Sequence, residues 1–116
     1  MMTIKRGDII LANLEPVMGS EQGKVRPCLV IQNDTSNTYS PTTIVASITS
    51  ATSDKKYPTE VSVSPKDSGL PKDSTVLLNQ IRTISISHRA IKMLGRLSEE
   101  KMAQVNEAIK VSLGLD

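Results

Sequence analysis

Aromatic side chains are almost absent from this sequence. Its 116 residues contain no Trp, no Phe and only two tyrosines, Tyr39 and Tyr57. The core therefore has to be packed from Val, Ile, Leu and Met, which favours short β-strands over a core built around aromatic rings. With so few rings, we expect stacking of nucleic-acid bases on aromatic side chains to have at most a small part in the function.

Cysteine and histidine are equally scarce. Cys28 is the only cysteine, so an intramolecular disulfide is excluded, and its place in an apolar run indicates a small core residue rather than a nucleophile. His88 is the only histidine, and neither residue has the paired spacing of a zinc site. No Gly-x-Ser-x-Gly motif offers a serine to His88, which we expect to be an exposed turn residue. The sequence predicts no metal and no cofactor.

Long apolar runs and strong net charge are also missing. No run approaches the roughly 18 residues that cross a bilayer, and residues 1–8 lack the apolar segment of a secretory signal. We therefore expect a cytoplasmic protein without membrane contact. The formal net charge of +2 permits a polyanionic partner but is far from that of a polybasic protein. The length is typical of one domain, expected to cover residues 1–116.

Short apolar or alternating runs predict several β-strands. In the run 43–50, Ile44, Ala46 and Ile48 face one way, whereas Val45, Ser47 and Thr49 face the other. Residues 33–42 and 65–73 have loop composition, and residues 85–90 are expected to form a turn or a single helical turn. The predicted strands are 7–14, 27–33, 43–50, 60–64, 74–84 and 91–97.

The clearest helix begins after Ser98, a favourable N-cap followed by two glutamates that complement the helix dipole. Gly114 is typical of a helix end. The residues at spacings of three and four that we expect to form one buried stripe are Met102, Val105, Ile109 and Leu113. Five to seven short strands followed by one helix predict an α+β domain, a small barrel-like antiparallel sheet with the helix packed against it.

The stretch GSEQGKVRPCLVIQND, residues 19–34, begins as a loop and ends as a strand, with Arg26 at the junction. Because a residue before proline is held extended, the Arg26 side chain has a fixed direction. A bound anion and an ion pair with Glu21 or Asp34 both explain an arginine here. The glycines lack the GxxxxGK[ST] spacing of a phosphate loop, so a flexible hairpin loop is the favoured interpretation.

Other polar residues have two interpretations each. Thr49, at a strand end, is an ordinary strand residue. Gln80 and Arg82 share one face near the end of the strand predicted for 74–84 and offer donors for bases and phosphates, although residues at strand ends usually meet solvent. Lys55 and Lys56, in the polar segment 50–58, are expected in solvent, with contact to a nucleic-acid backbone as the alternative.

Taken in order, these segments resemble MazF/PemK-type toxins of toxin–antitoxin modules, and most closely the Bacillus-type branch. The resemblance covers nearly the whole chain. Its most specific part is G-S-E-Q-x-x-x-R-P followed by an apolar strand. The matching segments are RGDI at 6–9, the stretch 19–34, TTIVASITS at 42–50, STVLLNQIRTI at 74–84 and the helical segment 99–115.

This resemblance implies an SH3-like barrel of the CcdB/MazF/PemK type, in a homodimer that cleaves single-stranded RNA, chiefly mRNA, at specific sequences. Cleavage without a metal would leave a 2′,3′-cyclic phosphate and a 5′-hydroxyl, inhibit translation and arrest growth. A cognate antitoxin would block the site with an extended, acidic segment. The alternatives are a toxin of the same fold that poisons DNA gyrase and a non-catalytic binding module.

The resemblance also implies roles for individual residues. Arg26 and Thr49 match the catalytic pair, and Glu21 matches a residue implicated in other members. Because the pKa of arginine exceeds about 12, we expect Arg26 to stabilise the phosphorane and to donate a proton, while Glu21 or Thr49 assists the 2′-hydroxyl. The residues expected to bind RNA are Ser20, Gln22, Lys55, Lys56, Gln80 and Arg82.

Overall fold

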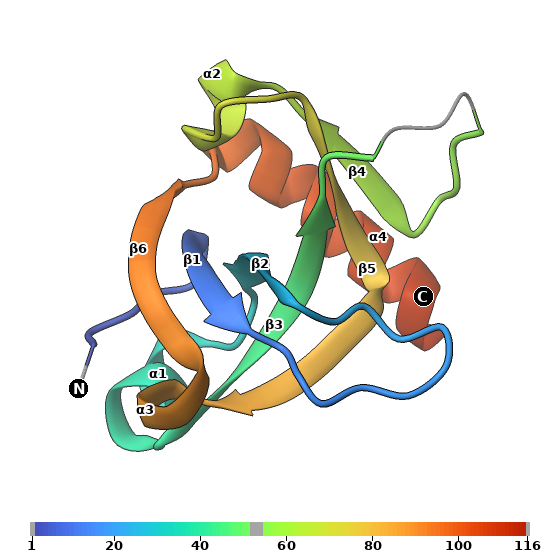
Figure 1. The fold of residues 1–116 in the computed structure, drawn as a ribbon. Helices are drawn as coiled ribbons and strands as arrows, with labels where there is room; N and C mark the ends of the chain where they lie inside the picture. Colours follow the sequence, from blue (N-terminus) through green and yellow to red (C-terminus); the bar gives the residue numbers. More distant parts are fainter. Residues whose placement is uncertain (1, 52–54, 116) are drawn as a thin grey trace.

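The computed structural model describes residues 2–51 and 55–115. Six strands form one antiparallel sheet in the order β4-β5-β3-β2-β1-β6. Figure 1 shows the sheet curving strongly, with the last helix along the side formed by β4 and β5. The elements are β1 (Asp8–Asn13), β2 (Val25–Val30), α1 (Asp34–Tyr39), β3 (Thr42–Thr49), β4 (Glu60–Val63), α2 (Pro65–Ser68), β5 (Ser74–Ser85), α3 (Ile86–Arg89), β6 (Ala90–Arg96) and α4 (Glu99–Leu113). The predicted α+β fold is confirmed.

Two segments with loop composition contain short helices, so their prediction as loops was wrong. In α1 the Asn33 side chain caps the helix by accepting from the Ser36 backbone N–H, and Asn37 is buried. In α2 the Ser64 and Asp67 side chains form a reciprocal capping box. Residues that favour turns thus stabilise these helices through their side chains, which a reading of composition overlooks.

One face of the sheet packs against α4. On the helix, Val105 and Ala108 are buried, and Met102 and Ile109 are partly buried. Leu113, predicted to belong to this stripe, is 59% exposed. In the last turn Ser112 faces the sheet instead and donates its hydroxyl to the carbonyl oxygen of Leu78 at 2.7 Å. The sheet residues of this core are Ile9, Leu29, Ala46, Ile48, Val61, Val63, Val76 and Leu78.

A second core lies on the opposite face of β1, β2, β3 and β5, beneath the N-terminal segment and α3. Its residues are Ile4, Ile10, Ala12, Leu14, Cys28, Val30, Val45, Ile84 and Ile86. Cys28 is fully buried, and desolvation raises the pKa of its thiol to about 12, although the nearby Arg26 and Arg82 act to lower it. The prediction of a core cysteine is therefore confirmed.

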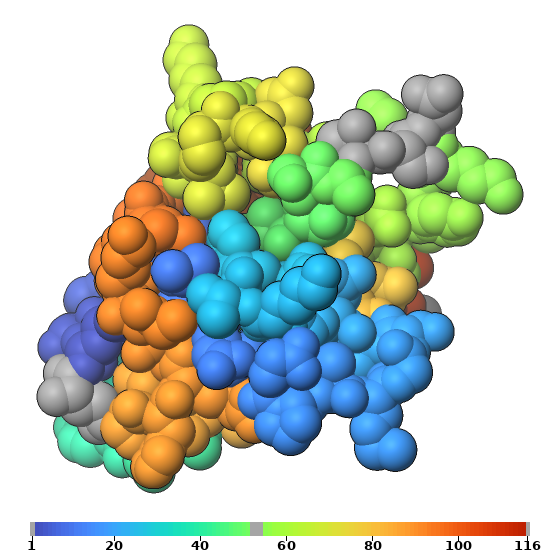
Figure 2. Space-filling view, viewed as in Figure 1, coloured from blue at the N-terminus to red at the C-terminus, as the bar shows by residue number. Residues whose placement is uncertain are grey.

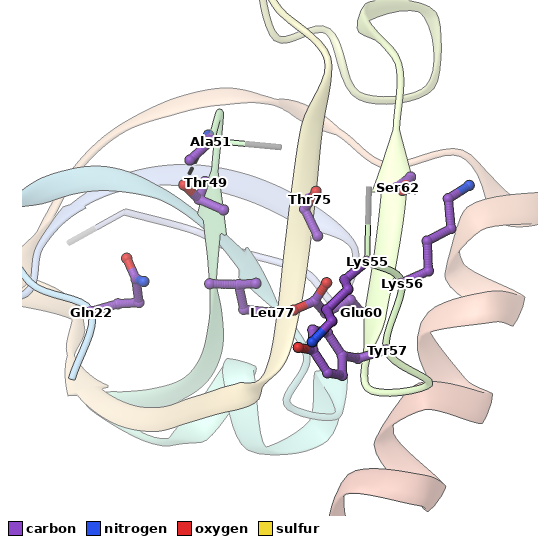
Figure 3. Close-up of a pocket in the computed structure, with 10 residues that line it drawn as sticks. All are labelled: Gln22, Thr49, Ala51, Lys55, Lys56, Tyr57, Glu60, Ser62, Thr75 and Leu77. Carbon is purple, nitrogen blue, oxygen red and sulfur yellow. Dashed lines mark hydrogen bonds between the residues drawn. The ribbon is translucent and has the colours of Figure 1, made fainter. Parts of the chain in front are cut away.

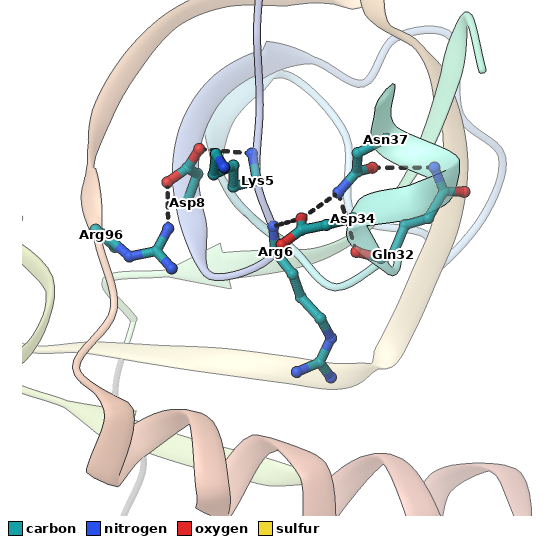
Figure 4. A network of polar contacts seen from close by, with 7 residues as sticks. All are labelled: Lys5, Arg6, Asp8, Gln32, Asp34, Asn37 and Arg96. Atoms are coloured by element: carbon teal, nitrogen blue, oxygen red, sulfur yellow. Dashed lines mark hydrogen bonds and ion pairs between the residues drawn. The ribbon is translucent and has the colours of Figure 1, made fainter. Parts of the chain in front are cut away.

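Polar contacts fasten the N-terminal segment to this framework (Figure 4). Arg96 pairs with Asp8 at 2.8 Å, and the Arg6 backbone N–H donates to Asp34 at 2.7 Å. That hydrogen bond is the main reason why the pKa of Asp34 is lowered. The RGDI segment thus stabilises the fold by attaching the N-terminal residues to Asp34 and Arg96. None of the helices in the two described ranges is long and apolar enough to cross a membrane.

Candidate functional site

Arg26 and Thr49 meet across two neighbouring strands. In the antiparallel pairing of β2 with β3, Cys28 lies opposite Ser47. Side chains two residues apart on a strand share a face, so continuing this register by two residues brings Arg26 opposite Thr49. Both residues line the same cavity, of about 400 Å³. The structure therefore brings together the two residues that the sequence analysis names as the catalytic pair.

Arg26 is only partly engaged by the protein. Its Nε donates to the carbonyl oxygen of Gly23 at 2.6 Å, while its Nη1 and Nη2 groups have no hydrogen-bond partner among the described residues. The ion pair with Glu21 or Asp34 considered from the sequence is not formed within the described residues; each of these carboxylates accepts a backbone N–H elsewhere. The two outer nitrogens of Arg26 can therefore hold two oxygens of one phosphate.

Thr49 ends β3 and has a fixed hydroxyl. Its Oγ1 accepts the Ala51 backbone N–H at 3.1 Å. That contact uses one lone pair and leaves the hydroxyl hydrogen to donate to a ligand. Thr49 thus offers a neutral donor beside the charged donors of Arg26.

Thr49 and Ala51 separate two cavities. The first, which we call the Leu70 pocket, is the 400 Å³ cavity that contains Arg26; its walls include Val25, Pro27, Leu70 and Lys72. The second, the Tyr57 pocket, has a volume of about 230 Å³. Figure 3 shows Leu77 on its floor, Gln22 approaching from the β1–β2 loop, and Tyr57 with neighbouring polar side chains on the other side. The further residues used below are Lys55, Lys56 and Glu60.

A third cavity, of about 500 Å³, shares Gln22 with the Tyr57 pocket and is lined by Glu21, Gln80 and Arg82. The three cavities are therefore joined in a row through shared residues. In Figure 2 the β1–β2 loop, in blue, projects from the body of the molecule, opposite the green segment that follows β3. Each cavity of the row carries at least one basic side chain, which suits a single-stranded polyanion.

Gln80 reaches the row because β5 is irregular. Ala46 pairs with Ile81 but Ser47 pairs with Leu77, so residues 78–80 bulge out of the ladder. The Gln80 Oε1 accepts the Gln22 backbone N–H at 3.1 Å. The β1–β2 loop, which the composition indicates to be a flexible hairpin, is thus tied to the sheet.

Two predicted site residues have structural contacts of their own. Arg82 donates to the carbonyl oxygen of Leu14 at 2.8 Å and holds the base of the β1–β2 loop. Glu21 accepts the Met18 backbone N–H at 2.8 Å within that loop and lines the third cavity, away from Arg26. Ser20 is exposed on the same loop. Lys55 and Lys56 line the Tyr57 pocket.

Several site residues were missed from the sequence. Tyr57 and Glu60 line the Tyr57 pocket, and Leu70 and Lys72 line the Leu70 pocket. The alternating run 60–64 predicts that Glu60 lies on a strand. Only the pairing of β4 with β5 shows on which face of the sheet its side chain lies. His88 is exposed, with its Nδ1 near two serine hydroxyls, so the prediction of an exposed turn residue is confirmed. In the described ranges, no group of three His, Cys, Asp or Glu side chains is placed to hold a metal.

Comparison with known proteins gives consistent matches over the whole chain. The family described as "PemK-like, MazF-like toxin of type II toxin-antitoxin system" matches residues 5–113. Endoribonuclease MazF of Staphylococcus epidermidis is 53% identical over 113 residues, which is 97% of this chain and 93% of that protein. The crystal structure of MazF from Deinococcus radiodurans has a TM-score of 0.83 at 27% identity, covering 99% of this chain and 100% of that one. A MazE–MazF structure from the same organism has a TM-score of 0.78 at 26% identity, with both chains fully covered.

Proposed function

Because the chain belongs to the PemK-like, MazF-like toxin family of type II toxin–antitoxin systems, we infer that it is an endoribonuclease toxin. We propose that it cleaves single-stranded RNA, chiefly mRNA, in the cytoplasm, at specific sequences and without a metal ion. The observation that supports this proposal is that Arg26 and Thr49 line one cavity, to which Arg26 offers two unengaged outer nitrogens and Thr49 its hydroxyl. The products would be a 2′,3′-cyclic phosphate and a 5′-hydroxyl.

The chemistry follows from the donors at hand. The 2′-oxygen bonds to phosphorus while the bond from phosphorus to the 5′-oxygen breaks, so negative charge grows on the other phosphate oxygens. Arg26 stabilises that charge through its two outer nitrogens, and Thr49 donates a third hydrogen bond. A guanidinium stays protonated, so Arg26 cannot accept the 2′-proton. It donates a hydrogen bond to the departing 5′-oxygen, which takes a proton from solvent water to become the 5′-hydroxyl.

Glu21 is our candidate for the acceptor of the 2′-proton. One of its carboxylate oxygens holds the Met18 N–H, and the other has no hydrogen-bond partner in the described part of the chain. It lies in the cavity next to the Tyr57 pocket, so it has to approach the cleaved bond by a shift of the β1–β2 loop. Glu21→Gln keeps the shape of the side chain but cannot accept a proton, so it should lower the single-turnover cleavage rate at least tenfold. An unchanged rate in this variant would exclude Glu21 as the acceptor of the 2′-proton.

We also propose a homodimer and a cognate antitoxin. The edge strand β6 exposes Ile91 and Met93, 51% and 43% accessible, and an edge with apolar side chains favours pairing with a second copy. The MazE–MazF structure of the relative supports an antitoxin partner. An extended acidic segment fits the basic side chains along the row of cavities. Light scattering should give twice the mass of one chain, whereas a monomer would contradict the dimer.

Cleavage of a long single-stranded RNA in excess EDTA tests the main proposal. The purified chain should produce discrete cuts with cyclic-phosphate ends, and Arg26→Ala and Thr49→Ala should lose them. His88→Ala is the matched control, because this exposed residue lies outside the row, and it should cut like the wild type. If no cuts appear, or if cuts survive both substitutions, a gyrase-binding assay becomes the next experiment.

A further inference from the structure

The floor of the Tyr57 pocket is the outer surface of three paired strands. In the β4–β5 ladder, Glu60 lies opposite Leu77 and Ser62 opposite Thr75; in the β3–β5 ladder, Thr75 lies opposite Thr49. Because directly paired residues point to the same face, all five side chains share the face that carries the cleavage pair. A group bound on this floor therefore lies next to the bond that Arg26 and Thr49 act on.

Glu60 is an unexpected residue in this place. Its side chain is half-buried, and its carboxylate has neither a hydrogen-bond nor an ion-pair partner within residues 2–51 and 55–115. The other charged groups of the pocket, Lys55 and Lys56, are basic. A carboxylate repels phosphate but accepts hydrogen bonds from the amino groups of bases. The Glu60 carboxylate therefore suits contact with the edge of an RNA base and not with the phosphate backbone of the RNA.

Tyr57 supplies the second element of a base site. Its side chain is half-exposed, and Figure 3 shows its ring beside Glu60 at the edge of the pocket. The Glu60 backbone N–H donates to the Tyr57 carbonyl oxygen at 3.0 Å, so one turn fixes both residues. Pro58 further restricts the backbone of Tyr57. A tyrosine ring held in this way offers a face on which a base of any kind can stack.

We propose that the Tyr57 pocket binds one base of the RNA next to the cleaved bond, with Tyr57 stacking on it and Glu60 selecting its identity. The volume of about 230 Å³ is below the range of roughly 300–1,000 Å³ typical of drug-sized ligands and suits a single base. Adenine, cytosine and guanine present an amino group to a carboxylate. Uracil has no amino group, and its single donor on this edge, N3–H, lies between two carbonyl oxygens that a carboxylate repels. Uracil is therefore disfavoured at this position.

The inference rests on the proposed endoribonuclease activity, and its test begins from cleavage by the wild type. A randomised single-stranded RNA pool is cut, and the ends are sequenced. The wild type should disfavour uracil about tenfold at one position beside the cut. Glu60→Ala and the conservative Glu60→Gln should remove that bias there and leave the other positions unchanged. Glu107→Gln, an equal charge change on exposed α4, is the control and should keep the bias.

Three results would overturn the proposal. An unchanged bias in both Glu60 variants would show that the carboxylate does not contact a base. A uniform rise in cleavage of all sequences would show that Glu60 only repels RNA. A wild type that cuts without disfavouring uracil beside the cut would exclude the selection itself. Absence of cleavage by the wild type would instead contradict the proposed function from which this inference begins.

Substitutions of Tyr57 should change KM and not the base preference, which distinguishes the role of Tyr57 from that of Glu60. Tyr57→Ala should raise KM about tenfold for every sequence and preserve the bias against uracil, because stacking tolerates all bases. Tyr57→Phe keeps the ring and should restore the wild-type KM. A Tyr57→Ala enzyme with unchanged KM, or a Tyr57→Phe enzyme as weak as Tyr57→Ala, would contradict a stacking role.

Discussion

Along β2 and β3, a shift of only two residues leads from a buried position in the core to the candidate cleavage site. Cys28 and Ser47 face each other across β2 and β3 and are almost completely buried, although Ser47 borders the 500 Å³ cavity. Arg26 and Thr49, two residues further along each strand, both line the Leu70 pocket. Backbone geometry and face are the same at both positions. The difference is the cover, since Cys28 packs in the second core with Ile4 of the N-terminal segment and Ile86 of α3, whereas Arg26 and Thr49 border a cavity. What covers a strand end decides whether it serves stability or function.

We expect the largest effect on the cleavage rate from a substitution of Arg26, at the uncovered end of β2. Arg26→Ala should lower the cleavage rate about 10²–10³-fold, because the main positive charge at the phosphate is lost. Its free energy of unfolding should change by no more than about 1 kcal/mol, since only the hydrogen bond to Gly23 is removed. Arg26→Lys keeps the charge without the paired donors and should remain well below the wild type. Single-turnover cleavage and urea unfolding measure the two quantities. An Arg26→Ala variant destabilised as much as a core variant would contradict the view that Arg26 serves function and not stability.

A substitution in the second core should have the opposite result, with a large loss of stability and little loss of cleavage. Ile84 is 1% exposed in the second core, so Ile84→Ala should cost about 2–5 kcal/mol of unfolding free energy. Its folded fraction should cleave RNA at nearly the wild-type rate under conditions in which it is folded. Urea unfolding and cleavage measured on one preparation test this. A large loss of activity per folded molecule would mean that the core also adjusts the site.

A smaller effect separates two roles of Thr49. Thr49→Val preserves the shape of a strand residue but removes the hydroxyl, and we expect cleavage to fall about tenfold to a hundredfold. Thr49→Ser retains the hydroxyl and should recover most of the rate. Rate constants at saturating RNA provide the measurement. Equal rates for the Val and Ser variants would assign Thr49 to packing.

The smallest effect concerns pH and the buried thiol. An unfolded chain loses the Cys28 proton near pH 9, whereas the folded chain retains it until about pH 12. Above pH 9 the unfolded state therefore binds fewer protons, and stability falls as pH rises through this window. Cys28→Val should remove that part of the slope, so its unfolding free energy should decline less steeply between pH 9 and pH 11. Identical slopes would show that the thiol is not shielded in the folded state.

The sequence predicts those parts of the molecule that depend on neighbours along the chain. The periodicity of the strands, the N-cap at Ser98 and the proline after Arg26 are local signals, and the structure has strands and a helix where they indicate them. Leu113 was misplaced because only the docked helix shows that Ser112 faces Leu78. Glu60 and Tyr57 were missed for the same kind of reason: their meaning depends on the pairing of β4 with β5, which no local pattern records.

The hydrogen bond between Gln22 and Gln80 has a thermodynamic consequence for the proposed nuclease. An RNA that uses the Gln80 carbonyl competes with the protein's own loop for one acceptor. The measured dissociation constant would then be the intrinsic one divided by the fraction of molecules whose loop is released. Affinity for RNA could change without any altered contact to the RNA, through the loop-opening equilibrium alone.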